Sequence, residues 1–144
     1  MNGDLPLPGH AYIPGQTPRH PEGAFDALRE TAQPGMSAEA LARSPAFCAG
    51  LRYLEAGYYW EAHEVLEPVW MALEEGMAER HCLQALIQLA NARLKARMGK
   101  PRAVARLGAI VLGHLDDCRA TGGGEVVMGV ALGVIRAEAE AMMA

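Results

Sequence analysis

The sequence predicts an all-α fold, a small antiparallel bundle of about five main helices that follows a proline-rich, irregular N-terminal arm. Three observations lead to this prediction. Apolar residues recur at helical spacing from residue 23 onward, and no segment shows strand alternation between hairpin turns. The breaks between the helical segments are short, which favours antiparallel neighbours. With 144 residues, 51% hydrophobic and 21% charged, the chain has the length and balance of one globular domain.

The arm is expected over residues 1–22 and a single helical domain over residues 23–144. The arm holds five prolines and three glycines, and this composition sustains neither a helix nor a central strand. It is therefore either a flexible arm or an extended strap over the core, with Tyr12 and Ile13 as candidate anchors. Two histidines of the arm stand beside glycine or proline and are expected to be exposed, namely His10 and His20.

Short helices are expected at the start of the domain. One covers residues 22–32 and is ended by Pro34 and Gly35, and another turn or two covers residues 37–42.

The first longer helix is expected to begin at Ser44 and to end at Gly57. Serine is a preferred N-cap residue, and Pro45 suits the first helical position. Glycine is the usual residue just past a helix end. The apolar face of this helix carries Phe47, Leu51 and Leu54.

The remaining helices are expected over residues 58–75, over 78–98, from Pro101 onward and over 125–142. Gly99 ends the second of these, and residues 121–124 form a glycine-rich break. This break lacks the lysine and the preceding strand of a phosphate loop, so it is interpreted as a plain linker. A row of small residues on the last helix is expected to allow close packing in the core or at a subunit contact: Gly129, Gly133 and Ala137.

Composition excludes several classes of function. The formal charge of −4 argues against a nucleic-acid-binding domain, no apolar stretch is long enough to span a membrane, and the N-terminus does not resemble a signal peptide. The three cysteines form no C-x-x-C motif and are expected to be buried, reduced thiols. We expect a cytoplasmic protein without nucleic-acid or membrane partners, with a small molecule or a second copy of the chain left open as a partner.

Charge is divided between two halves of the domain. Residues 46–79 hold seven acids and one base, a net of −6, whereas residues 80–120 hold eight bases and two acids, a net of +6. One interpretation is a mutual attraction that fixes the packing of two helix hairpins. The other is a charged cleft between them.

The helix expected over residues 58–75 carries the most informative pattern. At about 100° per residue, one face collects the apolar residues Tyr58, Tyr59, Ala62, Val65, Leu66, Val69 and Leu73. The other face collects Trp60, His63, Glu64, Glu67, Trp70 and Met71. Glu61 and Glu75 fall between the faces, on the expected solvent side. Two tryptophans are unusual on a solvated face, and a histidine with two glutamates is unusual in a core. The mixture predicts a half-buried polar site walled by indoles.

Partners for these acids are expected on the next helix, because a lone ionised carboxylate is costly to bury. A polar stripe recurs there at steps of three or four residues: Arg80, Gln84, Gln88, Asn91 and Lys95. A hairpin of the two helices would bring this stripe against His63 and its neighbouring acids.

Two further histidines are weaker candidates for metal ligands. His81 lies near the start of its helix beside Arg80, and it is expected to be exposed or to be a local hydrogen-bond partner. His114 stands beside Asp116 and Asp117, and we interpret this as a cap-like pairing rather than a set of metal ligands.

Three roles are compatible with the spacing of the central motif. His63 and Glu67 stand at i, i+4 with Glu64 adjacent, as in helical bundles that hold divalent metals, although this is not the H-E-x-x-H of zinc proteases. Without a metal, a glutamate beside the indoles and His63 would do acid–base work. Alternatively, the group is a buried hydrogen-bond network that fixes the pairing of two helices. The spacing leaves all three open.

The same residues resemble a known family. The nonapeptide 59–67, then Trp70, the segment 86–90 and Gly99 are similar to the domain of unknown function 309 family, over roughly residues 46–110. This family is all-helical and is commonly labelled a predicted metal-dependent hydrolase. Its pattern falls on Trp60, Glu61, His63, Glu64, Glu67, Trp70, Gln84 and Gln88.

The sequence departs from the family pattern at three positions. Pro68 stands where the family usually has a helix-favouring acid, which predicts a kink one turn after His63. Ala85 replaces a common glycine. Lys95 stands where many members carry a histidine, and a protonated lysine is not a metal ligand. Lys95 is instead expected to neutralise Glu64 or Glu67, which lowers the expectation of a bound metal.

The resemblance implies a small metal-dependent hydrolase with one divalent metal, zinc or manganese. In this hypothesis His63, Glu67 and Glu64 are the metal ligands, and Glu64 and His63 are the catalytic residues. The substrate-binding candidates are Trp60, Trp70, Arg80, Gln84, Gln88 and Lys95. The alternative hypothesis is a non-enzymatic helical binding or interaction module, in which the same His/Glu/Gln cluster is a structural buried network.

Overall fold

The computed structural model describes residues 5–144 and confirms the all-α prediction. Helices form nearly all of its regular structure, and a single pair of two-residue strands forms the rest. The elements in chain order are α1 (Asp26–Arg29), α2 (Ala38–Ala42), α3 (Pro45–Ala56), α4 (Tyr59–Ala72), α5 (Ala78–Arg97), α6 (Pro101–Ala120), β1 (Val126–Val127), β2 (Val130–Ala131) and α7 (Leu132–Met142).

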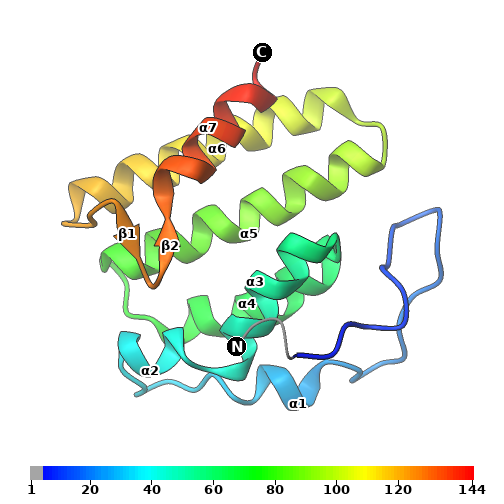
Figure 1. Ribbon diagram of the computed structural model, residues 1–144, viewed down its shortest axis with the longest axis horizontal. Helices are drawn as coiled ribbons and strands as arrows, with labels where there is room; N and C mark the ends of the chain where they lie inside the picture. Colours follow the sequence, from blue (N-terminus) through cyan, green and yellow to red (C-terminus); the bar gives the residue numbers. More distant parts are fainter. Residues whose placement is uncertain (1–4) are drawn as a thin grey trace.

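The long helices stack in chain order across the molecule (Figure 1). α3 packs on α4, α4 on α5, α5 on α6, and α6 on α7. In the view of Figure 1 the short helices α1 and α2 lie at the bottom, and α6 and α7 lie at the top. The helix α5 is therefore central, with α4 on one side and α6 on the other.

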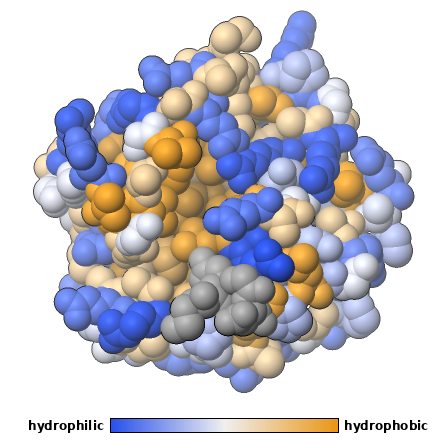
Figure 2. Space-filling view, in the orientation of Figure 1, coloured by the Kyte–Doolittle hydropathy of each residue, from blue (hydrophilic) through white to orange (hydrophobic). Residues whose placement is uncertain are grey.

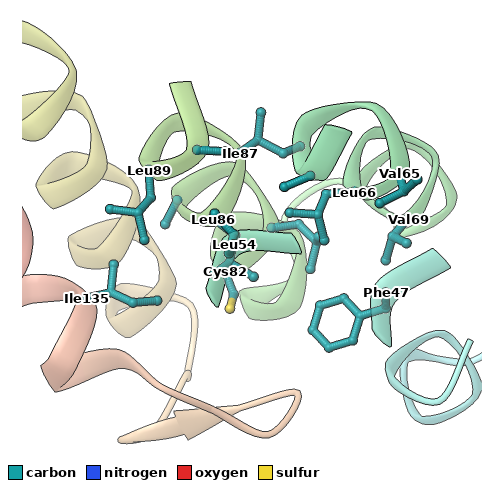
Figure 3. Packing of buried hydrophobic residues seen from close by; sticks show 14 of the residues in the cluster. Phe47, Leu54, Val65, Leu66, Val69, Cys82, Leu86, Ile87, Leu89 and Ile135 are labelled. Atoms are coloured by element: carbon teal, nitrogen blue, oxygen red, sulfur yellow. The ribbon is translucent and has the colours of Figure 1, made fainter. Parts of the chain in front are cut away.

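The core lies on both sides of α5. Figure 3 shows part of this core, with labels on Phe47 and Leu54 of α3, Val65, Leu66 and Val69 of α4, Cys82, Leu86, Ile87 and Leu89 of α5, and Ile135 of α7. Most of these side chains are almost completely removed from water. Burial of this kind is the main favourable term in folding, at about 25 cal/mol per Å² of apolar surface.

The boundaries of α3 are those expected from its capping residues. The Ser44 hydroxyl accepts a hydrogen bond from the backbone N–H of Phe47 at 3.2 Å, and Pro45 is the first helical residue. Gly57 ends the helix with a φ of 91°, a left-handed conformation that costs glycine little. Local signals alone were sufficient here.

Two expected helices differ from the structure. The segment 22–32 holds only the four-residue α1. The expected helix over 125–142 is wrong in its first part, because Val126–Val127 pair with Val130–Ala131 in an antiparallel hairpin. Met128 and Gly129 form its turn with φ values of 51° and 77°, the left-handed pair that suits a tight two-residue hairpin.

The row of small residues is consequently not a helical row. Gly129 lies in the hairpin turn, and a Cβ at Gly133 would meet nothing within 4 Å. The expectation that this row allows close helix packing in the core is therefore wrong. The alternative, a contact between subunits, stays a prediction. Figure 2 shows the molecule in the orientation of Figure 1, and apolar side chains gather there on the side where the hairpin and α7 lie.

Within residues 5–144, no helix combines the length and the apolar character needed to cross a membrane.

Candidate functional site

Glu61 is the most deeply buried acid of the α4 motif, with 0% of the residue exposed. Its Oε2 accepts a hydrogen bond from the backbone N–H of Tyr12 at 2.6 Å and lies 2.5 Å from Nε2 of His20. The expectation that Glu61 faces solvent is wrong. The expected exposure of His20 is also wrong, since its side chain is 9% exposed. Both corrections have one cause, which is that the N-terminal arm covers this side of α4.

The arm is a strap that is anchored on Trp60. Tyr12 is buried and packs edge-on against the Trp60 indole, with the ring centroids 5.2 Å apart. His20 stacks on the same indole at 5.9 Å, and Phe25 meets it edge-on at 6.1 Å. His10 is half-buried and stacks on His20. Of the two alternatives for the arm, residues 5–22 form the strap, with Tyr12 as an anchor, and residues 1–4 lie outside the described residues.

The buried carboxylate of Glu61 acts on a neighbouring phenol. The pKa of Tyr53 is raised, first by burial and second by the charge of Glu61. Only one of the two Glu61 oxygens is hydrogen-bonded, because Oε1 is buried without a partner among residues 5–144. The arm thus provides hydrogen-bond partners for one oxygen of this buried carboxylate, and the other oxygen has none among the described residues.

Arg29 of α1 binds the two other acids of the motif. Its guanidinium lies 3.3 Å from Oε1 of Glu67 and 3.8 Å from Oε2 of Glu64. It also donates a hydrogen bond to the backbone carbonyl of Glu64. In a regular helix that carbonyl would accept from the N–H of residue 68, which is a proline without an N–H. Arg29 therefore supplies the donor that Pro68 removes, and α4 is helical from Tyr59 to Ala72 across the proline.

His63 is half-exposed, and its Nε2 lies 3.5 Å from Oε2 of Glu67. The i, i+4 contact that the spacing predicts is therefore present. Within residues 5–144, however, His63, Glu64 and Glu67 do not converge as three metal ligands. The cation beside Glu64 and Glu67 is the guanidinium of Arg29, and it competes with any metal ion for the same oxygens. The donor set expected for a divalent metal does not fit this geometry.

The polar stripe of α5 does not supply the partners of these acids. No hydrogen bond or ion pair in the described part of the chain joins Gln84, Gln88 or Lys95 to the acids of α4. Gln88 accepts a hydrogen bond from Asn91 on its own helix at 3.1 Å. Arg29, rather than Lys95, neutralises Glu64 and Glu67. The expectation about Lys95 is corrected on this point.

Trp70 and Arg80 form a separate contact at the start of α5. The Arg80 guanidinium lies 4.6 Å from the centroid of the Trp70 ring, a distance at which a cation is attracted to an indole face. Trp70 Nε1 is buried without a hydrogen-bond partner in the described chain. The two tryptophans of α4 therefore serve different neighbours, since Trp60 contacts the arm and Trp70 contacts α5.

A cavity of about 530 Å³ lies between the strap, α1 and α4. Its wall carries aromatic, cationic and anionic side chains, including Arg19, His20, Phe25, Arg29, Trp60 and Glu64. A volume of this size is within the range of small-molecule sites. Two of its residues, Trp60 and Glu64, belong to the predicted site, and the others come from the N-terminal segment.

Sequence reasoning missed His20, Arg29 and the burial of Glu61. The proline at position 68 was the available signal for Arg29, because it leaves the Glu64 carbonyl without a helical donor. The presence of Glu61 in the family pattern was the available signal for its burial. His20 offered no signal, because it lies 41 residues from its partner.

A second polar cluster lies between α5 and α6. His81, His114 and Asp117 each offer one ligand atom, and the three atoms lie within 4.8 Å of one another. Burial lowers the pKa of His114, against an opposing effect of Asp117 and with a smaller contribution from His81. His81 is half-buried, so the expectation of an exposed His81 is not met. His81 thus joins His114 and Asp117 in a three-residue group, and the cap-like interpretation of His114 stays a prediction.

Residues 47–107 match the family model described as a domain of unknown function (DUF309). The family assignment drawn from the nonapeptide 59–67 is confirmed over this segment, which runs from α3 into α6. No curated protein and no solved structure matches the chain. Tyr12, His20 and Arg29 lie outside the matched segment, so the partners of the motif's acids come from a part of the chain that the family model does not cover.

Proposed function

We propose that this protein is a non-enzymatic helical binding module, in which Glu61 of α4 holds the N-terminal arm and Glu64 and Glu67 hold Arg29 of α1. The observation that supports this proposal is that all three acids of the motif already have partners. Glu61 is bound by Tyr12 and His20, and Glu64 and Glu67 are bound by Arg29. Each acid of the motif thus has a partner from the N-terminal segment. Buried or half-buried carboxylates that are already paired serve a structural role well and a metal poorly.

The ligand of this module is a small molecule in the cavity between the arm and α4. Trp60 and Phe25 offer ring surfaces for stacking, which favours a ligand with an aromatic ring. The wall also carries Arg19, Arg29 and Glu64, so it offers both signs of charge. An aromatic molecule with both an ammonium and a carboxylate group matches this wall better than one with a single charge.

Trp60 fluorescence tests this proposal. The chain has two tryptophans, so the variant Trp70→Phe leaves Trp60 as the only indole. We expect phenylalanine to change its emission in a saturable manner, and benzoate and benzylamine to act more weakly. The matched variant Trp60→Phe, which retains Trp70, is expected to show no saturable change. The absence of any saturable response at Trp60 would contradict a ligand site in this cavity.

The competing hypothesis is the metal-dependent hydrolase with ligands His63, Glu67 and Glu64. The 3.5 Å contact between His63 and Glu67 is the observation in its favour, and the Arg29 contacts are the observation against it. Thermal unfolding with added zinc or manganese separates the two. Under our proposal His63→Ala responds to metal as the unaltered protein does, whereas the hydrolase hypothesis requires His63→Ala to be stabilised less by metal than the unaltered protein.

A reducing, cytoplasmic setting is part of this proposal. Its support is that Cys48, Cys82 and Cys118 are all free thiols, as is usual in that compartment.

A further inference from the structure

Two imidazoles and a carboxylate meet where α5 and α6 pack side by side. His81 lies in the first turn of α5, and His114 and Asp117 lie one turn apart on α6. Residues at i, i+3 share one face of a helix, so the two α6 side chains face His81 together. None of the three lines the cavity at α4. The cluster is therefore independent of the proposed binding site.

We propose that His81, His114 and Asp117 bind one divalent transition-metal ion of the zinc class between α5 and α6. Two nitrogen ligands and one oxygen ligand suit zinc, cobalt, nickel or iron(II). Calcium and magnesium prefer all-oxygen sites, so they are not expected to compete. Helical bundles hold metals in this way, with histidine and carboxylate ligands one turn apart on facing helices.

The spacing of the ligand atoms agrees with such a site. In a tetrahedral zinc site with bonds of about 2.0–2.1 Å, two ligand atoms are about 3.3 Å apart. The three atoms here lie within 4.8 Å of one another. Small side-chain rotations therefore close the site, and no movement of the helices is required.

The hydrogen bonding of His81 gives an independent reason to expect a ligand. Its Nδ1 is buried and has no partner among residues 5–144. A buried ring nitrogen without a partner is costly, and an arriving ion would relieve this cost either by direct coordination or by a new orientation of the ring.

No ion pair of the described residues occupies the carboxylate of the cluster. Among the ion pairs of the described chain, none involves Asp117, His81 or His114. This contrasts with Glu64 and Glu67, which Arg29 already neutralises. Asp117 is exposed, so an ion has a path from solvent. Three protein ligands leave a coordination position for water.

Cobalt and zinc titrations of the full chain, purified without a histidine tag, test this site. We expect one equivalent of cobalt to produce the visible absorption of a low-symmetry site, and zinc to displace it. Asp117→Asn, His81→Gln and His114→Gln are each expected to weaken binding by roughly tenfold or more. The matched control His63→Gln is expected to leave the affinity unchanged.

Two outcomes overturn the proposal. One is the absence of one-to-one cobalt binding by the unaltered chain. The other is an affinity that Asp117→Asn leaves unchanged, or that His63→Gln lowers as much as the three ligand variants do. Since Asp117 is exposed, Asp117→Asn is expected to keep the helical circular dichroism of the parent. If either histidine variant fails to fold, the cobalt affinity of Asp117→Asn alone decides whether the proposed site exists.

Discussion

Glu61 is an acid in an unusual environment, because none of its surface is exposed to solvent. We expect Glu61→Gln to lower the free energy of unfolding by about 1–3 kcal/mol, since the amide replaces a charged acceptor of two hydrogen bonds from the arm. Urea unfolding followed by circular dichroism measures this loss. The exposed Glu55 of α3 provides the control, and Glu55→Gln is expected to change stability by no more than about 0.5 kcal/mol. Equal effects of the two substitutions would show that the arm contact contributes nothing.

Cys82 carries a prediction about alkaline pH. Burial, with smaller effects of Cys118 and Glu79, raises the pKa of the Cys82 thiol from 9.0 to about 12. Above pH 9 the unfolded chain releases this proton and the folded chain keeps it, so the free energy of unfolding falls as pH rises. The pKa values of Cys118 and Tyr53 are raised as well, and they act in the same direction.

We therefore expect stability to decline between about pH 9 and pH 11, by at most about 1.4 kcal/mol per pH unit for each group. Urea unfolding at several pH values measures the slope. Cys82→Ala is expected to flatten it, whereas Cys48→Ala, at a half-buried cysteine, is expected to leave it unchanged. A slope that is the same in Cys82→Ala and in the parent would contradict the assignment.

At the scale of elements, the contact between α3 and α4 depends on a glycine. A Cβ at Gly50 would overlap the side chain of Leu66, so the two helices approach closely at this point. We expect Gly50→Ala to destabilise the fold by about 1–3 kcal/mol because it overpacks a closed core. Thermal or urea unfolding measures this change.

Gly113 of α6 is the matched control for Gly50. A Cβ there would meet nothing within 4 Å, and alanine is a better helix former than glycine by about 1 kcal/mol. Gly113→Ala is therefore expected to stabilise the protein. If Gly50→Ala were stabilising too, the close approach of α3 to α4 would be refuted.

The element scale also shows which parts of the fold were predictable. Ser44, Pro45 and Gly57 act through their immediate neighbours, so the ends of α3 followed from the sequence. The hairpin at 126–131 was missed because Met128 in a left-handed conformation is not a recognised turn signal. Its strands are also too short to show an alternating pattern.

At the scale of the whole molecule, the path of the arm was not predictable. The contacts of Glu61 with Tyr12 and His20 span 49 and 41 residues, and no local pattern in residues 5–22 encodes them. The mixed polar face of α4 was predicted correctly, because helical spacing alone determines which residues share a face. The partners of its acids were assigned to the wrong helix, because those partners are distant in sequence. A helical wheel gives the direction of a side chain and says nothing about which distant segment covers it.

The uneven charge of the two halves has a weaker effect than expected. In the described chain, one ion pair joins residues 46–79 to residues 80–120, between Arg80 and a largely exposed Glu75 at 3.8 Å. Exposed pairs of this kind contribute little. The arginines of α5 instead bind other groups, as when Arg93 binds Glu138 of α7 and Arg97 binds the backbone carbonyl of Gly57. Mutual attraction of the halves through ion pairs is therefore a minor factor in their packing.

Glu61 of α4 holds the N-terminal arm through the backbone of Tyr12, and amide hydrogen exchange at Tyr12 measures this contact. In the intact protein the Tyr12 amide donates to a fully buried carboxylate, so NMR is expected to show slow exchange there. Glu61→Gln is expected to accelerate exchange at Tyr12 and to leave the amides of α5 protected. A Tyr12 amide that exchanges in the parent protein as fast as in an unfolded chain would contradict the claim.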